Sequence, residues 1–262
     1  MSDVVAAGSG FSIGRVASLT FAVIGRNLVP FLAMSIVSVL PQEFMAQYFL
    51  RTIQTGGKID PSKMATASYW LVLFSDELLS IVLAFLLQAA LVHGTIADLN
   101  GKPVSIGEAV KSSFRVFWPL IGLAIVSTLG AGVGFVLLVI PGIILLVMWI
   151  VSVPVLVVEH KGIFDSLSRS GDLTSGYRWS IFGIVIVFYV AAVILQVTVK
   201  PLAGLSLIAT SNPAFSPLGI TLDLALRTAT SVVGITGIAC LYYELRSAKE
   251  GIGPEQLASV FD

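Results

Sequence analysis

A chain of 262 residues with 56% hydrophobic and only 11% charged residues lies outside the soluble globular range, in which about 25% of residues are charged. The 15 basic and 15 acidic residues leave no net charge to attract nucleic acid, and no block of five basic residues occurs, which excludes nucleic acid as a partner. The single cysteine, Cys240, excludes an internal disulfide and a cysteine-rich metal site. The composition predicts an all-α integral membrane protein.

Six apolar stretches predict membrane-spanning helices. They lie at about 28–49, 78–97, 118–140, 142–159, 179–199 and 222–244. Residues 116–158 carry no charged side chain, and as one helix they would measure roughly 65 Å, about twice the ~30 Å hydrocarbon core of a bilayer. The chain must therefore turn back within this run, and Pro141-Gly142 is the predicted hairpin turn, because both residues break helices and favour tight turns.

Each pair of spans follows a segment that is too polar to cross a membrane but has helical apolar spacing. The clearest segment is 105–117, in which Ser105 and Glu108 form a capping box at the start. The others are 11–27 and, more weakly patterned, 162–175. The pattern predicts six transmembrane helices as three hairpins, each preceded by a cytoplasmic amphipathic helix, in a single polytopic domain over 1–262. The uncharged stretch 201–221 is rich in Pro and Gly, and we predict a loop there, with at most one interfacial turn.

Orientation follows from the basic residues near the ends of the spans. With the N-terminus inside, the cytoplasmic basic residues are Arg15, Arg26, Lys102, Lys111, Arg115, Lys161, Arg169, Arg178, Arg246 and Lys249. Those outside are Arg51, Lys58, Lys63, Lys200 and Arg227. This excess predicts that both termini are cytoplasmic.

A more specific pattern begins at the predicted central turn. It comprises Val139-Ile140-Pro141-Gly142-Ile143, Trp149, Pro154, Glu159, Ser166-Leu167-Ser168-Arg169-Ser170 and Leu173-Thr174-Ser175-Gly176-Tyr177-Arg178-Trp179. The pattern resembles bacterial six-span proteins related to the membrane domain of glycerophosphoryl diester phosphodiesterases and to the YciC-like proteins. The resemblance covers most of the chain from residue 88 onward and implies a multi-pass protein of the bacterial cytoplasmic membrane. Only about 15 residues follow the last predicted span, so the resemblance does not carry over a hydrolase activity.

Four residues near the end of the fourth span are candidate lipid or ion-pair contacts: Glu159, Arg169, Arg178 and Trp179. A carboxylate and two guanidinium groups in one cytoplasmic segment suit a local ion pair or a clamp for a lipid phosphate. The competing interpretation is an interface charge at a helix end. Trp179 suits the headgroup level, because its ring is amphipathic.

The remaining candidates concern helix packing. Gly130 and Gly134 form a small-residue face that lets another helix approach closely, in the same chain or in another subunit. Gln88 is the strongly polar side chain near the centre of a charge-free span, where a hydrogen bond between helices competes with a substrate site as its role. Asp223 and Arg227 lie four residues apart, so we expect them to pair.

Motifs for catalysis are missing from the sequence. It has no HExxH pair, no GxSxG serine elbow and no nucleotide-binding P-loop, so we predict neither an enzyme nor a cofactor or metal site. The leading hypothesis is a non-enzymatic membrane protein of envelope or lipid homeostasis, or an accessory subunit of a membrane complex. Its expected partners are membrane lipids and, through Gly130 and Gly134, other membrane-protein subunits. The alternatives are a transporter or channel for a lipidic or weakly polar solute and, as a weaker third, an intramembrane enzyme acting on lipid-linked substrates.

Overall fold

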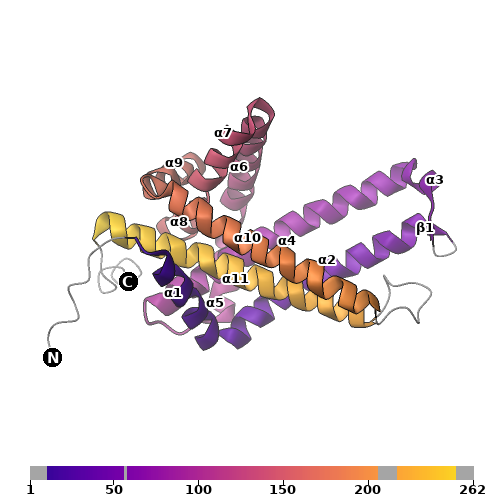
Figure 1. Ribbon diagram of the computed structural model, residues 1–262, viewed down its shortest axis with the longest axis horizontal. Helices are drawn as coiled ribbons and strands as arrows, with labels where there is room; N and C mark the ends of the chain where they lie inside the picture. Colours follow the sequence, from indigo (N-terminus) through magenta and orange to yellow (C-terminus); the bar gives the residue numbers. More distant parts are fainter. Residues whose placement is uncertain (1–10, 56–57, 206–216, 252–262) are drawn as a thin grey trace.

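The computed structural model describes residues 11–55, 58–205 and 217–251, and nearly all of them are helical (Figure 1). The helices are α1 (Ile13–Arg26), α2 (Leu28–Ile53), α3 (Pro61–Met64), α4 (Ala67–Leu99), α5 (Ile106–Arg115), α6 (Phe117–Leu137), α7 (Val139–Met148), α8 (Ser152–Glu159), α9 (Ile163–Thr174), α10 (Arg178–Leu205) and α11 (Pro217–Glu250). A two-residue antiparallel ladder joins β1 (Gln54–Thr55) to β2 (Lys58–Ile59), between α2 and α3.

Six helical stretches within the described residues are long and apolar enough to cross a membrane. They are Leu28–Met45, Ala67–Leu99, Phe117–Leu137, Val139–Glu159, Arg178–Val199 and Gly219–Glu250. This confirms the predicted number of spans, and the chain is a multi-pass integral membrane protein. In an aqueous protein the exposed apolar side chains of α10, such as Val187 and Ile194, would be unfavourable, whereas here lipid is their solvent.

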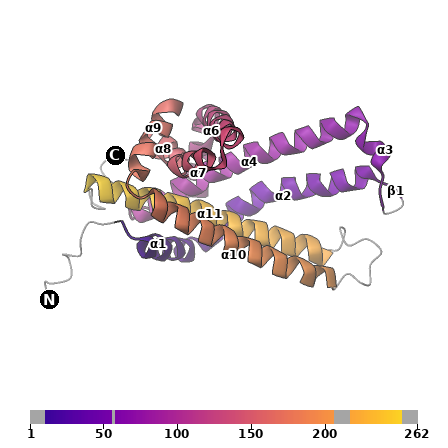
Figure 2. The same ribbon diagram turned by 45° about the horizontal axis from the view of Figure 1, so that its top comes forward.

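The most buried element is the short helix α8, not the middle of a long span. Every side chain from Ser152 to Val158 is buried, because α4, α6, α9 and α11 all pack around this helix. Both views place α1, α8 and α9 at the end of the molecule opposite α3 and β1 (Figures 1 and 2). We call this the surface-helix end. Helix α11 links it to the rest of the fold, since α11 packs against α1, α2, α4 and α10.

The turn between α6 and α7 lies at Leu138, so the predicted position at Pro141-Gly142 was wrong. Leu138 is extended, with φ −164° and ψ 144°, and helix α7 has already begun at Val139. Pro141 fits the first turn of α7, where its missing N–H has no intrahelical partner to lose. Gly142 faces α6, where an added Cβ would lie 2.6 Å from Cγ of Phe135. The Pro-Gly pair therefore starts the second helix and allows it to lie close to the first.

The predicted span 142–159 is not one continuous helix. Helix α7 ends at Met148 and α8 begins at Ser152, with three turn residues between them. Pro154 explains the break, because it has no N–H to donate to the carbonyl four residues earlier, at Ile150, and its ring would clash with that carbonyl.

Two other boundaries differ from those predicted. Helix α4 begins eleven residues before the predicted 78, and its 33 residues measure about 50 Å, so it extends well beyond a ~30 Å hydrocarbon core. The prediction began at 78 because Asp76 and Glu77 end the uncharged run, but the helix continues through these two residues. Helices α10 and α11 also occupy both ends of the stretch 201–221 predicted as a loop, and its remaining part, 206–216, lies outside the described residues.

Candidate functional site

Two hydroxyl groups of helix α9 point inward, toward the break between α7 and α8. Ser170 Oγ donates to the carbonyl of Met148 at 2.7 Å, and Thr174 Oγ1 lies 3.4 Å from the same oxygen. The N–H of Ser152, the ordinary helical partner of that carbonyl, bonds to Trp149 instead. The buried hydroxyl groups of α9 therefore satisfy a carbonyl that the break leaves without a helical partner.

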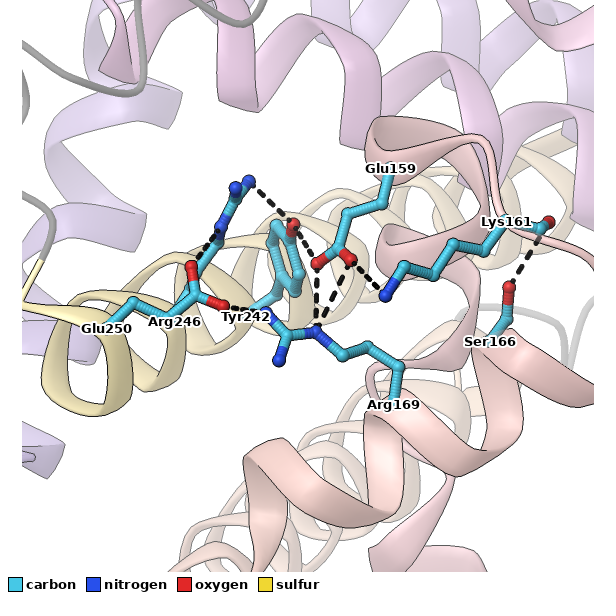
Figure 3. Close-up of polar contacts among 7 residues, drawn as sticks. All are labelled: Glu159, Lys161, Ser166, Arg169, Tyr242, Arg246 and Glu250. Atoms are coloured by element: carbon cyan, nitrogen blue, oxygen red, sulfur yellow. Dashed lines mark hydrogen bonds and ion pairs between the residues drawn. The ribbon is translucent and has the colours of Figure 1, made fainter.

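A group of charged and phenolic side chains lies at the C-terminal end of α8 (Figure 3). We call it the Glu159 cluster, and its members are Glu159, Lys161, Arg169, Tyr242, Arg246 and Glu250. The Glu159 carboxylate lies 3.3 Å from Nε of Arg169 and 3.1 Å from Nζ of Lys161, and it accepts a hydrogen bond of 3.0 Å from the hydroxyl of Tyr242. The cluster thus joins the end of α8 to both α9 and α11.

The α11 side of the cluster completes the pairing of its charges. Arg246 lies 2.9 Å from the carboxylate of Glu250 and donates to the Tyr242 hydroxyl at 3.2 Å. Glu250 also pairs with Arg169. Each basic group therefore faces a carboxylate, and a lipid phosphate would have to compete with these internal partners. Of the three interpretations offered for Glu159 and Arg169, which are an ion pair, a lipid-phosphate clamp and an interface charge, the geometry favours the ion pair.

The other two candidate contacts lie apart from this cluster, at the start of α10. Trp179 is 86% exposed, as an interfacial anchor requires. Arg178 is half-buried, and its Nε has no hydrogen-bond partner among the described residues. The contacts of the Glu159 cluster include neither residue.

The small-residue face of α6 packs against α7 of the same chain. A Cβ on Gly130 would lie 2.6 Å from the ring of Trp149, and one on Gly134 would lie 3.0 Å from Cα of Gly142. The space beside the two glycines is thus filled by residues of the same chain, including Gly142 of α7 and Trp149 directly after it. Gln88 is half-buried in α4, and its predicted role as a bond between helices stays a prediction.

A feature that the sequence analysis missed lies on α2, α4 and α11, three helices that pack against one another. Four buried hydroxyl groups there have no hydrogen-bond partner among the described residues: Ser35 on α2, Thr95 on α4, and Thr228 and Thr236 on α11. A buried polar group left unpaired costs about 1–3 kcal/mol. We call this set of four the hydroxyl seam. Its signal in the sequence was the spacing of eight between Thr228 and Thr236, which places them near one face of a helix.

Charged groups lie at both ends of the hydroxyl seam. At one end Arg227 bonds to Asp223 at 2.6 Å, which confirms the expected pair, and also lies 3.8 Å from the buried carboxylate of Glu43. At the other end Asp98 accepts from Asn27 at 2.6 Å and pairs with Arg26 at 2.5 Å. The hydrogen bond to Asp98 raises the pKa of the Arg26 guanidinium.

An apolar groove opens beside the seam, between α2, α4 and the surface helix α5. Its volume is about 250 Å³. Its lining is Ala33, Met34, Val37, Ser38, Leu83, Leu86, Leu87, Ala90, Ile106, Val110, Ser113 and Phe114. The three α5 side chains that give this helix its apolar face, Ile106, Val110 and Phe114, are exposed as well as lining the groove. The capping bond predicted for α5 is present, from the N–H of Glu108 to Ser105 Oγ at 3.4 Å.

The described residues include no group of three or more His, Cys, Asp or Glu side chains arranged to hold a metal ion. No protein-family model, curated protein or solved structure matches the chain. The resemblance to the six-span bacterial family therefore stays a prediction.

Proposed function

We propose that this chain is a non-enzymatic phospholipid-binding protein of the bacterial cytoplasmic membrane, acting in envelope or lipid homeostasis. The observation that carries the proposal is the apolar groove, whose walls are two spans and an amphipathic helix. A groove formed by membrane spans lies at acyl-chain depth, while a helix with an exposed apolar face lies at the headgroup level. One phospholipid contacts both levels at once.

The proposed orientation puts the three surface helices α1, α5 and α9 on the cytoplasmic side, each before a hairpin of spans. It is supported by the ten basic residues assigned to that side against five on the other. In this orientation the groove opens to the inner leaflet, where anionic lipids gather.

The positive charge on α5 supports the binding of a lipid with an anionic headgroup. Lys111 and Arg115 are exposed on this helix, one and five residues after Val110 of the groove wall. Near a membrane surface each basic residue contributes about 1 kcal/mol to the binding of anionic lipid. We therefore expect the lipid phosphate above the groove, beside these two side chains, and one acyl chain within it.

Native mass spectrometry of the full chain, released from mild detergent, tests this proposal. We expect retained phospholipid, with phosphatidylglycerol bound in preference to phosphatidylcholine. Filling the groove with Ala33→Phe should remove the bound lipid, whereas Ala191→Phe, on the exposed surface of α10, should not. Replacing both Lys111 and Arg115 by Gln should reduce the preference for phosphatidylglycerol by about tenfold or more. Equal lipid retention by wild type and Ala33→Phe would refute the proposed site.

A further inference from the structure

The hydroxyl seam extends through most of the membrane's thickness. Three contacts fix the levels of its helices: Asn27 with Asp98, Ser38 Oγ with the carbonyl of Leu83 at 3.1 Å, and Glu43 with Arg227. Asn27, which directly precedes α2, and Glu43 on α2 are sixteen residues apart, which is about 24 Å along a helix, against a hydrocarbon core of ~30 Å.

The four unpaired hydroxyl groups are distributed between these two charged ends. Thr95 lies one helical turn from Asp98, and Thr228 directly follows Arg227. Ser35 lies midway between Asn27 and Glu43 on α2, and Thr236 is eight residues from Thr228, about 12 Å along α11. The hydroxyl groups therefore lie near each charged end and about midway between the two ends.

The four hydroxyl groups differ from others in the same spans. Thr230 and Thr198 each donate to the carbonyl four residues earlier, at 2.8 and 2.7 Å, which is the usual way for a hydroxyl to be satisfied in lipid. The seam hydroxyls do not make this bond, although all four are at least 96% buried. Water is the small partner that supplies both a donor and an acceptor to such groups.

We propose that the hydroxyl seam holds a file of water molecules and conducts protons between Glu43 and Asp98. The Glu43 carboxylate takes a proton from the side of the membrane on which Arg227 lies. Each water or hydroxyl in the file then accepts one proton and passes one on, and Asp98 releases a proton at the surface-helix end. No bond other than O–H bonds forms or breaks, and the file itself is regenerated when its hydroxyl groups turn back. The three helices pack against one another along the seam, so the path suits protons rather than hydrated ions.

Proton conduction along the hydroxyl seam does not depend on lipid in the α5 groove. The failure of one proposal would therefore leave the other unaffected. The test uses the full chain reconstituted in phosphatidylcholine vesicles that contain a pH-sensitive dye, with a potassium diffusion potential set by valinomycin. We expect proton uptake at least tenfold faster than in protein-free vesicles. Glu43→Gln should reduce this uptake at least tenfold, because an amide does not exchange a proton in this pH range.

Matched threonine variants separate a water file from ordinary packing. Thr236→Val should slow proton uptake several-fold, and Thr236→Ser, which keeps the hydroxyl, should restore it. Thr230→Val serves as the control, because its hydroxyl is satisfied within α11, and it should conduct like wild type. Each variant is first checked for a monodisperse elution profile and unchanged helical circular dichroism. Should Glu43→Gln fail this check, the three threonine variants still decide the matter. Uptake no faster than in empty vesicles, or equal uptake by wild type and Thr236→Val, would overturn the proposal.

Discussion

Removing the hydroxyl groups of α9 that bond to the α7–α8 break should destabilise the protein. Ser170→Ala alone removes the 2.7 Å bond to the Met148 carbonyl but leaves Thr174 Oγ1 at 3.4 Å from it, so we expect a loss of about 1 kcal/mol. The double variant Ser170→Ala, Thr174→Val leaves this buried carbonyl without either hydroxyl, and the loss should be about 2–3 kcal/mol. For a chain of this size each kcal/mol lowers the unfolding temperature by about 2–4 °C, so the double variant should unfold about 4–12 °C below wild type.

The single cysteine provides the assay. Cys240 is 0% exposed in the folded protein, so a maleimide dye that fluoresces on thiol addition reports unfolding during a temperature ramp in detergent. Thr198→Val is the control, because its hydroxyl bonds within an exposed part of α10, and we expect less than 1 °C of change. If Cys240 of the double variant reacts at the wild-type temperature, the break does not depend on α9 and the reasoning fails.

Two further predictions concern packing and the Glu159 cluster. Gly142→Leu should lower the unfolding temperature by several degrees, since overpacking costs about 1–3 kcal/mol. Gly132→Leu is the control and should not lower it, because Gly132 has open space around it. Equal unfolding temperatures for the two variants would contradict the close approach of α6 and α7. Glu159→Gln should destabilise the protein by more than Lys161→Gln. The first variant removes a carboxylate partner of Arg169, which is only 23% exposed, whereas the second leaves Glu159 its contacts with Arg169 and Tyr242. Chemical denaturation of both variants measures the difference, and the reverse order would show that Glu159 does not hold α8 to α9.

Hydropathy was sufficient to predict the membrane-spanning segments but not the positions at which their helices are interrupted. The uncharged runs predicted six membrane helices because the hydrocarbon core excludes charges over about 20 residues, wherever the helices pack. The turn was misplaced by three residues, because Pro tolerates the first turn of a helix as well as a loop, and sequence pattern does not distinguish the two. The break before α8 could have been predicted from the sequence, because Pro154 lies inside the predicted span 142–159, where a proline interrupts a helix.

The contacts of the candidate sites are likewise of two kinds, those that the sequence predicts and those that depend on tertiary packing. Asp223 and Arg227 are four residues apart on one helix, so helical geometry alone brings them together. Glu159 and Tyr242 are separated by 83 residues, and Arg227 lies far along the chain from Glu43. No local period relates such residues, so their contact depends on which faces of α2, α8 and α11 meet.

The sequence by itself determined that this chain is a membrane protein, how many of its segments are long and apolar enough to cross the membrane, and which segments are too polar to do so. These properties depend on composition over the length of a helix. The tertiary structure decided what Pro141 and Gly142 do, which carbonyl the hydroxyls of α9 satisfy, and which buried hydroxyls on α2, α4 and α11 have no partner among the described residues. The physical reason is that lipid selects for apolar surface without regard to direction, whereas a polar group buried in lipid needs a partner at about 3 Å. Where a polar group's own helix does not supply that partner, the packing of helices distant in sequence must do so.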